Sequence, residues 1–567
     1  MKRINYLASF LIAALVLSSC GGLEKMKEEA SDLQFNVTPK VLEMHGGQVE
    51  YSIKGDIPAE WFNKKAIVEF TPVLTYENGE KAMESKTYQG EKVEANNKVI
   101  AYETGGSVEF SGVIDYVEDM RMSDLEMRGT ATVKDNSLEL PSIKVADGII
   151  ATPSLVMVNP MPIAAADKFE RVIPVEQGAD IHYVIQRSNI RRSELTDEDI
   201  KALEEFIKEA KDKENLEFKG IKISAYASPD GPMDLNEKLS EGRKESANKY
   251  LDGVVNGDDA EKLYQMHTTA EDWDGFKKLV EASDIEDKNL ILRVLSMYSD
   301  PDVREREIKN MAATYKVLAE DILPDLRRSE IKVNVDKIGF SDEEIVEFAK
   351  SNPDTLNLEE MLYAGALVPT NEEKLAVYEK TAEKYPECMR ANNNVGYVNI
   401  LMDNLDAAKV ALEKANELKE GNPIVTNNLG VIALREGDKE AAEEYFVEAT
   451  DAGTAVDYNL GIIKIMDGEY EAAVNYFQNH QTFNTALAML LAGKTDAAFK
   501  TVDALDDGAA MNYYLKAVIG ARMDDVKIVM DNLRTAVGKD SELIEMAKTD
   551  MEFAKFFQNE TFKSIIE

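Results

Sequence analysis

The chain has 567 residues, of which 44% are hydrophobic, and a formal net charge of −40 at pH 7. Its length predicts three or four domains, and its apolar content is enough to give each a buried core. So negative a surface repels phosphate backbones, and we therefore expect no nucleic-acid partner. The only two cysteines, Cys20 and Cys388, exclude a disulfide framework.

The first 19 residues have the layout of a secretory signal. Lys2 and Arg3 precede an apolar run over 6–17, which is too short for a membrane-spanning helix of roughly 20 residues. The run ends at Leu17-Ser18-Ser19-Cys20, which resembles the bacterial lipobox. The resemblance implies that Cys20 is lipidated and anchors the chain to a membrane, because two or more acyl chains hold a protein stably. The alternative is a cysteine that follows a soluble secretory signal by chance.

Residues 20–31 predict a lipidated, flexible spacer, because they are small or charged and have no apolar periodicity.

Residues 32–165 predict an antiparallel β-sandwich. Val49, Tyr51 and Ile53 alternate with polar residues, and turn signals recur at short intervals. One larger sandwich and two small sheets both fit this pattern. Three prolines, at 153, 160 and 162, indicate a linker at its end.

Residues 166–340 predict a mixed α/β domain. Strands are expected at 182–185, 218–227 and 331–335, with a charged helical insertion over about 252–326. The stretch from Asn236 to Arg243 resembles the N-x-x-L-S-x-x-R signature of the OmpA-like domain, and Arg327 to Val333 resembles the closing strand of that family.

This resemblance implies contact with peptidoglycan, whose stem peptide the family holds between an aspartate and an arginine. A zwitterionic ligand suits one fixed anion and one bidentate cation. Arg243 falls on the family arginine, whereas Ser228 falls on the aspartate, with Asp230 two residues further on. These three residues are the candidate peptidoglycan site. The alternative is that Arg243 has a structural role and the domain is a scaffold.

Residues 341–567 predict an all-α solenoid of repeats. Asn393-Asn394-Val395-Gly396 recurs 34 residues later as Asn427-Asn428-Leu429-Gly430, and Tyr458-Asn459-Leu460-Gly461 follows after another 31. Twelve residues after each glycine comes an alanine, and four residues later a large apolar residue that we expect to fill the next groove. The pattern resembles the tetratricopeptide repeat, and degenerate units are expected at 358–387, 484–508 and 510–537.

Arrays of this family bind protein segments on their concave face, so the resemblance implies protein partners. Asn394, Asn428 and Asn459 lie on the first helix of each clear repeat and are candidates for binding a peptide backbone. The alternative is that they form hydrogen bonds within their own helices.

No motif for catalysis, metal or cofactor binding is present, and the four histidines lack metal-ligand spacing, so we expect neither an enzyme nor a cofactor. The whole architecture resembles cell-envelope lipoproteins of the Bacteroides group. The sequence therefore predicts a non-enzymatic outer-membrane scaffold. The periplasmic face is favoured, because the surface export signals of this bacterial group resemble a dense acidic patch close to the cysteine, and none directly follows Cys20. The alternative is a surface-exposed adhesion or glycan-capture lipoprotein that binds through its β-sandwich.

Overall fold

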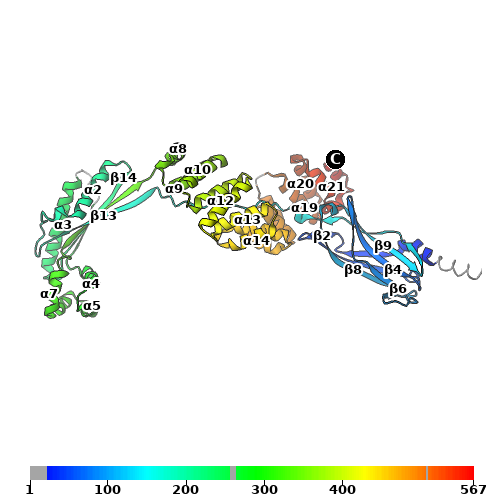
Figure 1. Cartoon of the computed structure of the whole chain (residues 1–567), viewed down its shortest axis with the longest axis horizontal. Coiled ribbons are helices and arrows are strands. Elements are labelled where there is room, and N and C mark those ends of the chain that lie inside the picture. The colour runs from blue at the N-terminus through cyan, green and yellow to red at the C-terminus, as the bar shows by residue number, and fades with distance from the viewer. Residues whose placement is uncertain (1–21, 256–263, 506–507) are drawn as a thin grey trace, which may run out of the picture. The chain divides into compact units, whose positions relative to one another are not determined.

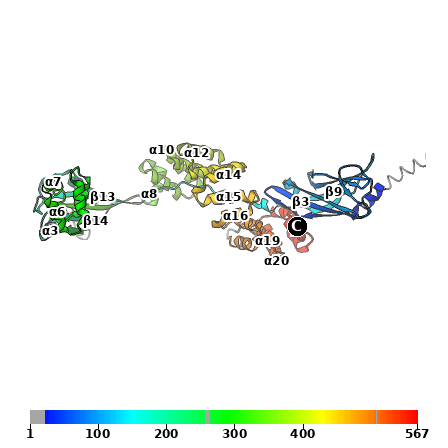
Figure 2. The ribbon, with the colours of Figure 1, turned by 90° about the horizontal axis from the view of Figure 1, so that it is seen from below.

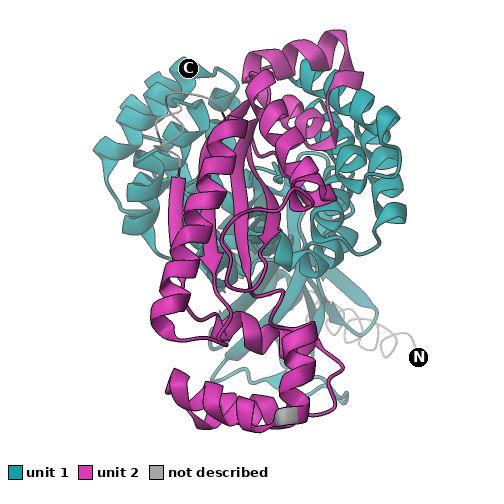
Figure 3. Cartoon of the chain, turned by 90° about the vertical axis from the view of Figure 1, so that its left-hand side faces the viewer, with its two compact units in different colours: residues 1–165, 370–567 teal, residues 166–369 magenta. Residues whose placement is uncertain are grey.

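The computed structural model describes residues 22–255, 264–505 and 508–567 (Figure 1). The chain divides into two compact units, residues 1–165 with 370–567 and residues 166–369 (Figure 3). The predicted signal peptide and Cys20 lie outside the described residues. Within the described residues, no helix combines the length and the apolar character needed to cross a membrane.

The predicted spacer is structured where it is described. Residues 22–28 are helical, and a 3-10 turn over Ala30–Asp32 follows them. Leu23 and Met26 are buried in the hydrophobic core of the β-rich region. The prediction of a flexible spacer is therefore wrong for this segment, because two apolar side chains one turn apart are enough to fix one helix face to a core.

Two sheets make up the β-rich region over residues 22–165. The five-stranded sheet contains β1 (Gln34–Thr38), β2 (Leu42–His45), β3 (Gln48–Ile57), β8 (Gly106–Asp115) and β12 (Ile149–Ile150). The seven-stranded sheet contains β4 (Ile67–Tyr76), β5 (Gly79–Ala82), β6 (Lys86–Gly90), β7 (Lys98–Ile100), β9 (Ser123–Val133), β10 (Asn136–Glu139) and β11 (Ile143–Asp147).

Buried side chains of both sheets form one hydrophobic cluster. The predicted alternation is present, since every second residue of β3, including Val49, Tyr51 and Ile53, is buried. Most strand pairs are antiparallel as predicted, but β12 runs parallel to β2, and β7 runs parallel to β6. The prediction of a purely antiparallel arrangement is therefore wrong at two strand pairs. In both exceptions the parallel strand is short, with two or three residues.

The second unit is built on a mixed sheet of order β13-β16-β14-β15. Its strands are β13 (Val172–His182), β14 (Leu216–Tyr226), β15 (Tyr264–Thr269) and β16 (Arg328–Ile338), and β16 is antiparallel to both neighbours. Two helices, α2 (Glu198–Asp212) and α3 (Met233–Val255), pack on this sheet and share its core.

Two strands differ from the sequence-based prediction. The first strand lies at 172–182 rather than 182–185. The predicted helical insertion contributes β15, which pairs parallel with β14. This strand could not be recognised by alternation, because its side chains are mostly exposed.

Beyond β15, the described part of the insertion is mostly helical, as expected. It contains α4 (Trp273–Ala282), α5 (Lys288–Met297), α6 (Pro301–Asn310) and α7 (Ala312–Asp321), which enclose a small hydrophobic core of their own. After β16 come α8 (Asp342–Ser351) and α9 (Leu358–Leu367), which belong to this unit by their contacts, whereas the sequence-based domains assign them to the solenoid.

A series of antiparallel helix pairs forms the rest of the chain, and neighbouring pairs follow one another from α10 to α20 (Figure 2). The helices are α10 (Asn371–Lys384), α11 (Met389–Leu401), α12 (Leu405–Leu418), α13 (Pro423–Arg435), α14 (Lys439–Glu448), α15 (Thr454–Met466), α16 (Tyr470–Tyr476), α17 (Phe483–Leu491), α18 (Thr495–Asp503), α19 (Ala510–Arg522), α20 (Val526–Lys539), α21 (Leu543–Thr549) and α22 (Glu560–Ile566).

The repeated glycines mark the closest approach within each pair. A Cβ added to Gly461 would lie 2.5 Å from the ring of Phe477, and one added to Gly430 would lie 2.8 Å from the ring of Phe446. The large residue therefore packs against the glycine of its own repeat, and the prediction that it fills the next groove is wrong. Glycine is required here because any larger side chain would push the two helices apart.

Candidate functional site

An asparagine lies at a corresponding position of the first helix in four successive helix pairs. These residues are Asn394 on α11, Asn428 on α13, Asn459 on α15 and Asn484 on α17. All four side chains are buried. A buried amide is costly unless its oxygen and its nitrogen both find partners. Each of these side chains therefore needs a donor for its oxygen and an acceptor for its nitrogen within the structure.

The partners are main-chain groups of residues 157–165, the segment that follows the β-rich region. Asn428 accepts a hydrogen bond from the Ile163 amide at 2.7 Å and donates one to the Ile163 carbonyl at 2.8 Å. Asn394 binds both groups of Ala165 in the same way, at 2.7 and 3.0 Å. Each asparagine side chain therefore binds one residue of the segment through the amide and the carbonyl of that residue.

The same geometry continues along the array. Asn459 binds the amide and the carbonyl of Met161 at 2.6 and 3.0 Å. Asn484 binds those of Met157 at 2.9 and 2.8 Å. The segment runs in the opposite direction to the repeats, because later residues of the segment meet earlier helices. We call Asn394, Asn428, Asn459 and Asn484 the asparagine ladder.

The residue before each of the first three ladder asparagines supports the ladder through hydrogen bonds. Asn393 donates to the Ile163 carbonyl at 3.2 Å and accepts a hydrogen bond from Asn428 at 3.0 Å, so it links two successive rungs. Asn427 links the next two rungs in the same way, since it donates to the Met161 carbonyl at 3.1 Å and accepts from Asn459 at 2.9 Å. The amides form one continuous network in which each oxygen and nitrogen has a defined role.

A tyrosine replaces the supporting asparagine in the next repeat. The Tyr458 hydroxyl donates to the side-chain oxygen of Asn159 at 2.7 Å and accepts a hydrogen bond from Asn484 at 3.1 Å. Burial raises the pKa of this hydroxyl, so it stays protonated and able to donate. The segment advances four residues at this step, from Met161 to Met157, and Asn159 occupies the extra length.

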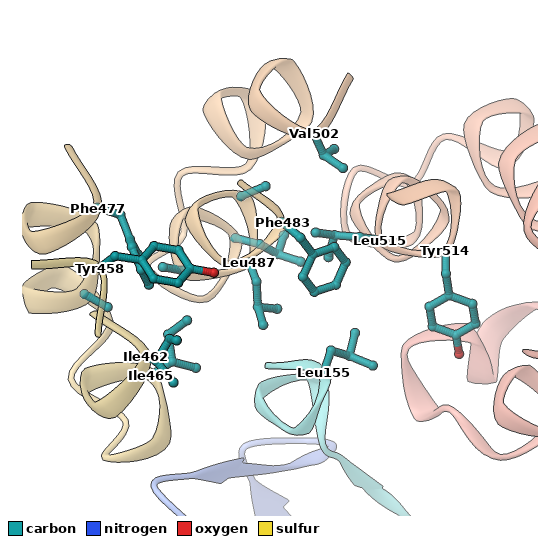
Figure 4. Packing of buried hydrophobic residues seen from close by; sticks show 14 of the residues in the cluster. Leu155, Tyr458, Ile462, Ile465, Phe477, Phe483, Leu487, Val502, Tyr514 and Leu515 are labelled. Atoms are coloured by element: carbon teal, nitrogen blue, oxygen red, sulfur yellow. The ribbon is translucent and has the colours of Figure 1, made fainter. Parts of the chain in front are cut away.

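Apolar packing fixes the start of the segment. A 3-10 turn over Thr152–Leu155 places Leu155 in the hydrophobic cluster of the array, among Phe483, Leu487 and Leu515 (Figure 4). Val156, Met157, Met161 and Ile163 pack against the same cluster and are partly exposed. The segment is thus held by main-chain hydrogen bonds along its length and by side-chain burial at one end.

The three candidates from the sequence, Asn394, Asn428 and Asn459, are three of the four rungs. They bind the main chain of a segment of the same chain, where a proline-marked linker was expected, and their binding of a separate peptide stays a prediction. The fourth rung was missed because Asn484 follows Asn459 after only 25 residues rather than 34. The supporting role of Asn393 and Asn427 could have been found, because both are part of the repeated motif.

The structure also brings together the candidate peptidoglycan residues of the second unit. Arg243, on α3, is only 1% exposed and donates to the carbonyls of Tyr226 and Arg187 at 2.7 and 3.2 Å. Its guanidinium lies over the ring of Tyr183, 5.2 Å from the centroid. Burial lowers its pKa to about 10, so the side chain is still charged at neutral pH.

Ser228 and Asp230 lie in the loop after β14 and have internal partners as well. The Ser228 hydroxyl donates to Asp230 and accepts from Arg327 at 3.2 Å. Asp230 forms an ion pair with Arg327 at 3.4 Å, and it is 14% exposed. No local sequence pattern indicated that Arg327 would occupy this loop. A ligand ammonium would therefore have to displace Arg327 to reach the Asp230 carboxylate, and a ligand carboxylate would meet a buried Arg243.

Within the described residues, no group of three or more histidine, cysteine, aspartate or glutamate side chains is arranged to hold a metal ion. The ladder is uncharged and contains no group that could act as a nucleophile. Its chemistry is recognition of an extended main chain by neutral amides.

A family model described as tetratricopeptide repeat matches residues 390–422 and 426–452, which span α11 to α14. The chain therefore contains tetratricopeptide repeats, and two ladder residues, Asn394 and Asn428, lie within them. No curated protein matches the chain.

Several solved structures are similar to parts of the chain. YrrB, described as a TPR protein with an unusual peptide-binding site, is 19% identical, covers 31% of this chain and 97% of its own, and has a TM-score of 0.26. PilW, a type IV pilus biogenesis factor, is 16% identical with 40% and 98% coverage and a TM-score of 0.26. A tetratricopeptide repeat protein from Parabacteroides merdae is 13% identical with 37% and 91% coverage and a TM-score of 0.29.

Proposed function

We propose that this protein is a non-enzymatic scaffold of the bacterial envelope, anchored in the outer membrane by lipid on Cys20, whose tetratricopeptide array binds protein. The observation that carries the proposal is the asparagine ladder. An array that binds eight main-chain groups of an extended segment, two at each rung, has the chemistry of a peptide-binding module.

A second surface of the array supports protein binding while its ladder is occupied. Val410 on α12 is 70% exposed and Val447 on α14 is 57% exposed, although both are apolar. A cavity of about 340 Å³ opens beside these helices and is lined by Leu429, Ile432, Tyr445 and several charged residues. Exposed apolar side chains next to a hollow are typical of surfaces that bind another protein.

Photo-crosslinking in living cells tests this proposal. A photoreactive residue at Val410 or at Val447 is expected to capture the same partner protein, whereas one at Val113, an equally exposed valine of β8, is the matched control. Capture of no protein from either array position, with the chain correctly exported, would contradict the proposed scaffold function.

The anchor and its side of the membrane are tested separately. Cys20→Ser is expected to release a folded protein from the membrane fraction, because the acyl chains supply the attachment. Protease added to intact cells is expected to leave the chain uncut if it faces the periplasm. Degradation would instead support the surface-exposed, glycan-capture alternative.

The second unit is the proposed wall-contacting part of the scaffold. Arg243, Ser228 and Asp230 come together at one end of β14, which supports this proposal, although all three have internal partners. Binding to sacculi is therefore proposed to require that the loop over residues 228–230 opens.

A further inference from the structure

Prolines alternate with the residues that the ladder binds. The ladder bonds the main chain of Met161, Ile163 and Ala165; Pro160 directly precedes the first of these residues, and Pro162 lies between the first two. In an extended chain, alternate residues face the same side, so the two prolines share the side opposite that of the ladder-bonded residues; Pro160 is buried there and Pro162 is half-buried. The residue at 164, which continues the proline series, is an exposed alanine.

This alternation has two physical effects. Proline fixes its own φ and restrains the residue before it to extended conformations, so the segment needs little further ordering to bind. Proline also lacks an amide hydrogen. A shift of the segment by one residue would therefore present Pro162 to an asparagine oxygen that requires a donor, so the prolines disfavour that shift.

The binding site that the asparagine ladder forms, which we call the groove, and the segment bound to it are uncharged, and the ladder contacts the segment through main-chain groups. Residues 151–166 contain no charged residue, and the rungs are neutral amides. A charged chain terminus gains nothing from such a site, whereas an uncharged internal segment loses nothing by entering it. The bound segment also lies 229 to 327 residues away from the rungs in sequence, so its attachment to the groove is non-covalent along the whole ladder.

On the basis of the proposed protein-binding function, we propose that the ladder is a receptor for uncharged, extended segments with prolines at alternate positions, and that residues 157–165 occupy it as a built-in competitor. A partner that carries such a segment binds where the chain's own segment leaves. The groove is therefore closed in the isolated protein and open to a matching partner when the segment is released.

A labelled peptide of residues 155–166, added to the full chain in detergent, tests the proposal. The double variant Ile163→Pro/Ala165→Pro removes two amide donors from the chain's own segment, and Ala164→Pro, which is in phase with Pro160 and Pro162, is the control. The peptide is expected to bind the double variant at least about tenfold more tightly than the wild type or the control, since a tethered segment competes at about millimolar effective concentration. Asn428→Ala added to the double variant is expected to abolish this binding.

Hydrogen exchange on the wild-type chain provides a second measurement that requires no substitution. Isotopically heavy peptide at several millimolar is expected to accelerate amide exchange in the chain's own residues 157–165 several-fold. If exchange is unchanged and the folded double variant binds no peptide, the segment is a permanent strut and the proposal is overturned. If the double variant does not fold, the exchange result alone decides. Neither result affects the photo-crosslinking test of the scaffold function.

Discussion

The asparagine ladder and the side chains of Arg243, Arg327, Ser228 and Asp230, which we call the arginine cluster, both bury polar groups but differ in charge and in where their partners come from. The ladder uses neutral amides, and its partners belong to a separate segment that enters the groove from far away in the sequence. The arginine cluster uses charged groups, and its partners are carbonyls and side chains of the same domain. Of the two sets, the ladder has the partner that could be exchanged for another molecule.

The difference shows what makes a candidate binding residue usable. Arg243 is bound to the carbonyls of Tyr226 and Arg187, which are fixed by the fold, so its hydrogen bonds stabilise the domain. Asn428 is bound to the amide and the carbonyl of Ile163, groups that the fold of the array does not itself supply. Both residues repeat or match a motif, and only their partners separate a structural role from recognition.

The largest effect is expected from Asn428→Ala. The substitution leaves the Ile163 amide and the side-chain oxygen of Asn393 without a partner and removes one of the two donors to the Ile163 carbonyl, and each buried unpaired group costs about 1–3 kcal/mol. We expect the free energy of unfolding to fall by about 4 kcal/mol in denaturant titrations. The control is Asn399→Ala, a buried asparagine that donates to Val395 in its own helix, for which about 1 kcal/mol is expected. Equal losses would mean that the ladder adds nothing beyond local bonding.

Arg243→Ala tests the other half of the comparison. It removes two hydrogen bonds to main-chain carbonyls and the contact with Tyr183, and we expect a loss of about 3 kcal/mol in the stability of the second unit. Asp230→Asn keeps the size of the side chain but removes its charge, so it is the sharper test of wall binding. If sacculi pull down the Asp230→Asn variant as well as the wild type, this carboxylate does not bind a stem-peptide ammonium.

A buried carboxyl beyond the ladder predicts a pH dependence for the array. Burial, and then the charge of Glu552, raise the pKa of Asp550 to about 6, and the Tyr514 hydroxyl donates to it at 2.8 Å. Between pH 4 and 6 the unfolded chain loses this proton while the folded chain keeps it, so this group makes the fold less stable as pH rises. The cost is complete above about pH 6 and amounts to about 3 kcal/mol. Thermal melts of wild type and Asp550→Asn from pH 4 to 7 measure it, and the difference between the two should change with pH only if Asp550 titrates as described.

The smallest of these effects concerns the helix pairing that supports the ladder. Gly461→Ala places a Cβ 2.5 Å from the ring of Phe477, and such overpacking costs about 2 kcal/mol. Gly538→Ala, in α20, meets nothing within 4 Å and should stabilise the protein by about 0.5–1 kcal/mol. A stabilising Gly461→Ala would show that the helices of this repeat can move apart freely.

The sequence predicted local features well and their partners poorly. The alternation in β3 and the period that identifies Asn394, Asn428 and Asn459 are short-range patterns, and the structure contains them. The identity of the peptide was out of reach, because no local pattern links Ile163 to Asn428 across 265 residues.

The same limit explains the arginine cluster and β15. The resemblance placed Arg243 and Ser228 near each other, but Arg327 reaches Ser228 from 99 residues away. Strand β15 lies at a sheet edge with exposed side chains, so neither hydrophobic periodicity nor turn signals revealed it.

The helical residues 22–28 would limit the distance between the protein and a membrane if Cys20 carries a lipid. Leu23 is buried in the core of the β-rich region and follows Cys20 by three residues, which span at most about 11 Å when fully extended. In that case the short tether holds the β-rich region next to the lipid headgroups. Inserting residues between Cys20 and Leu23 would then increase the distance from the membrane that the rest of the chain can reach.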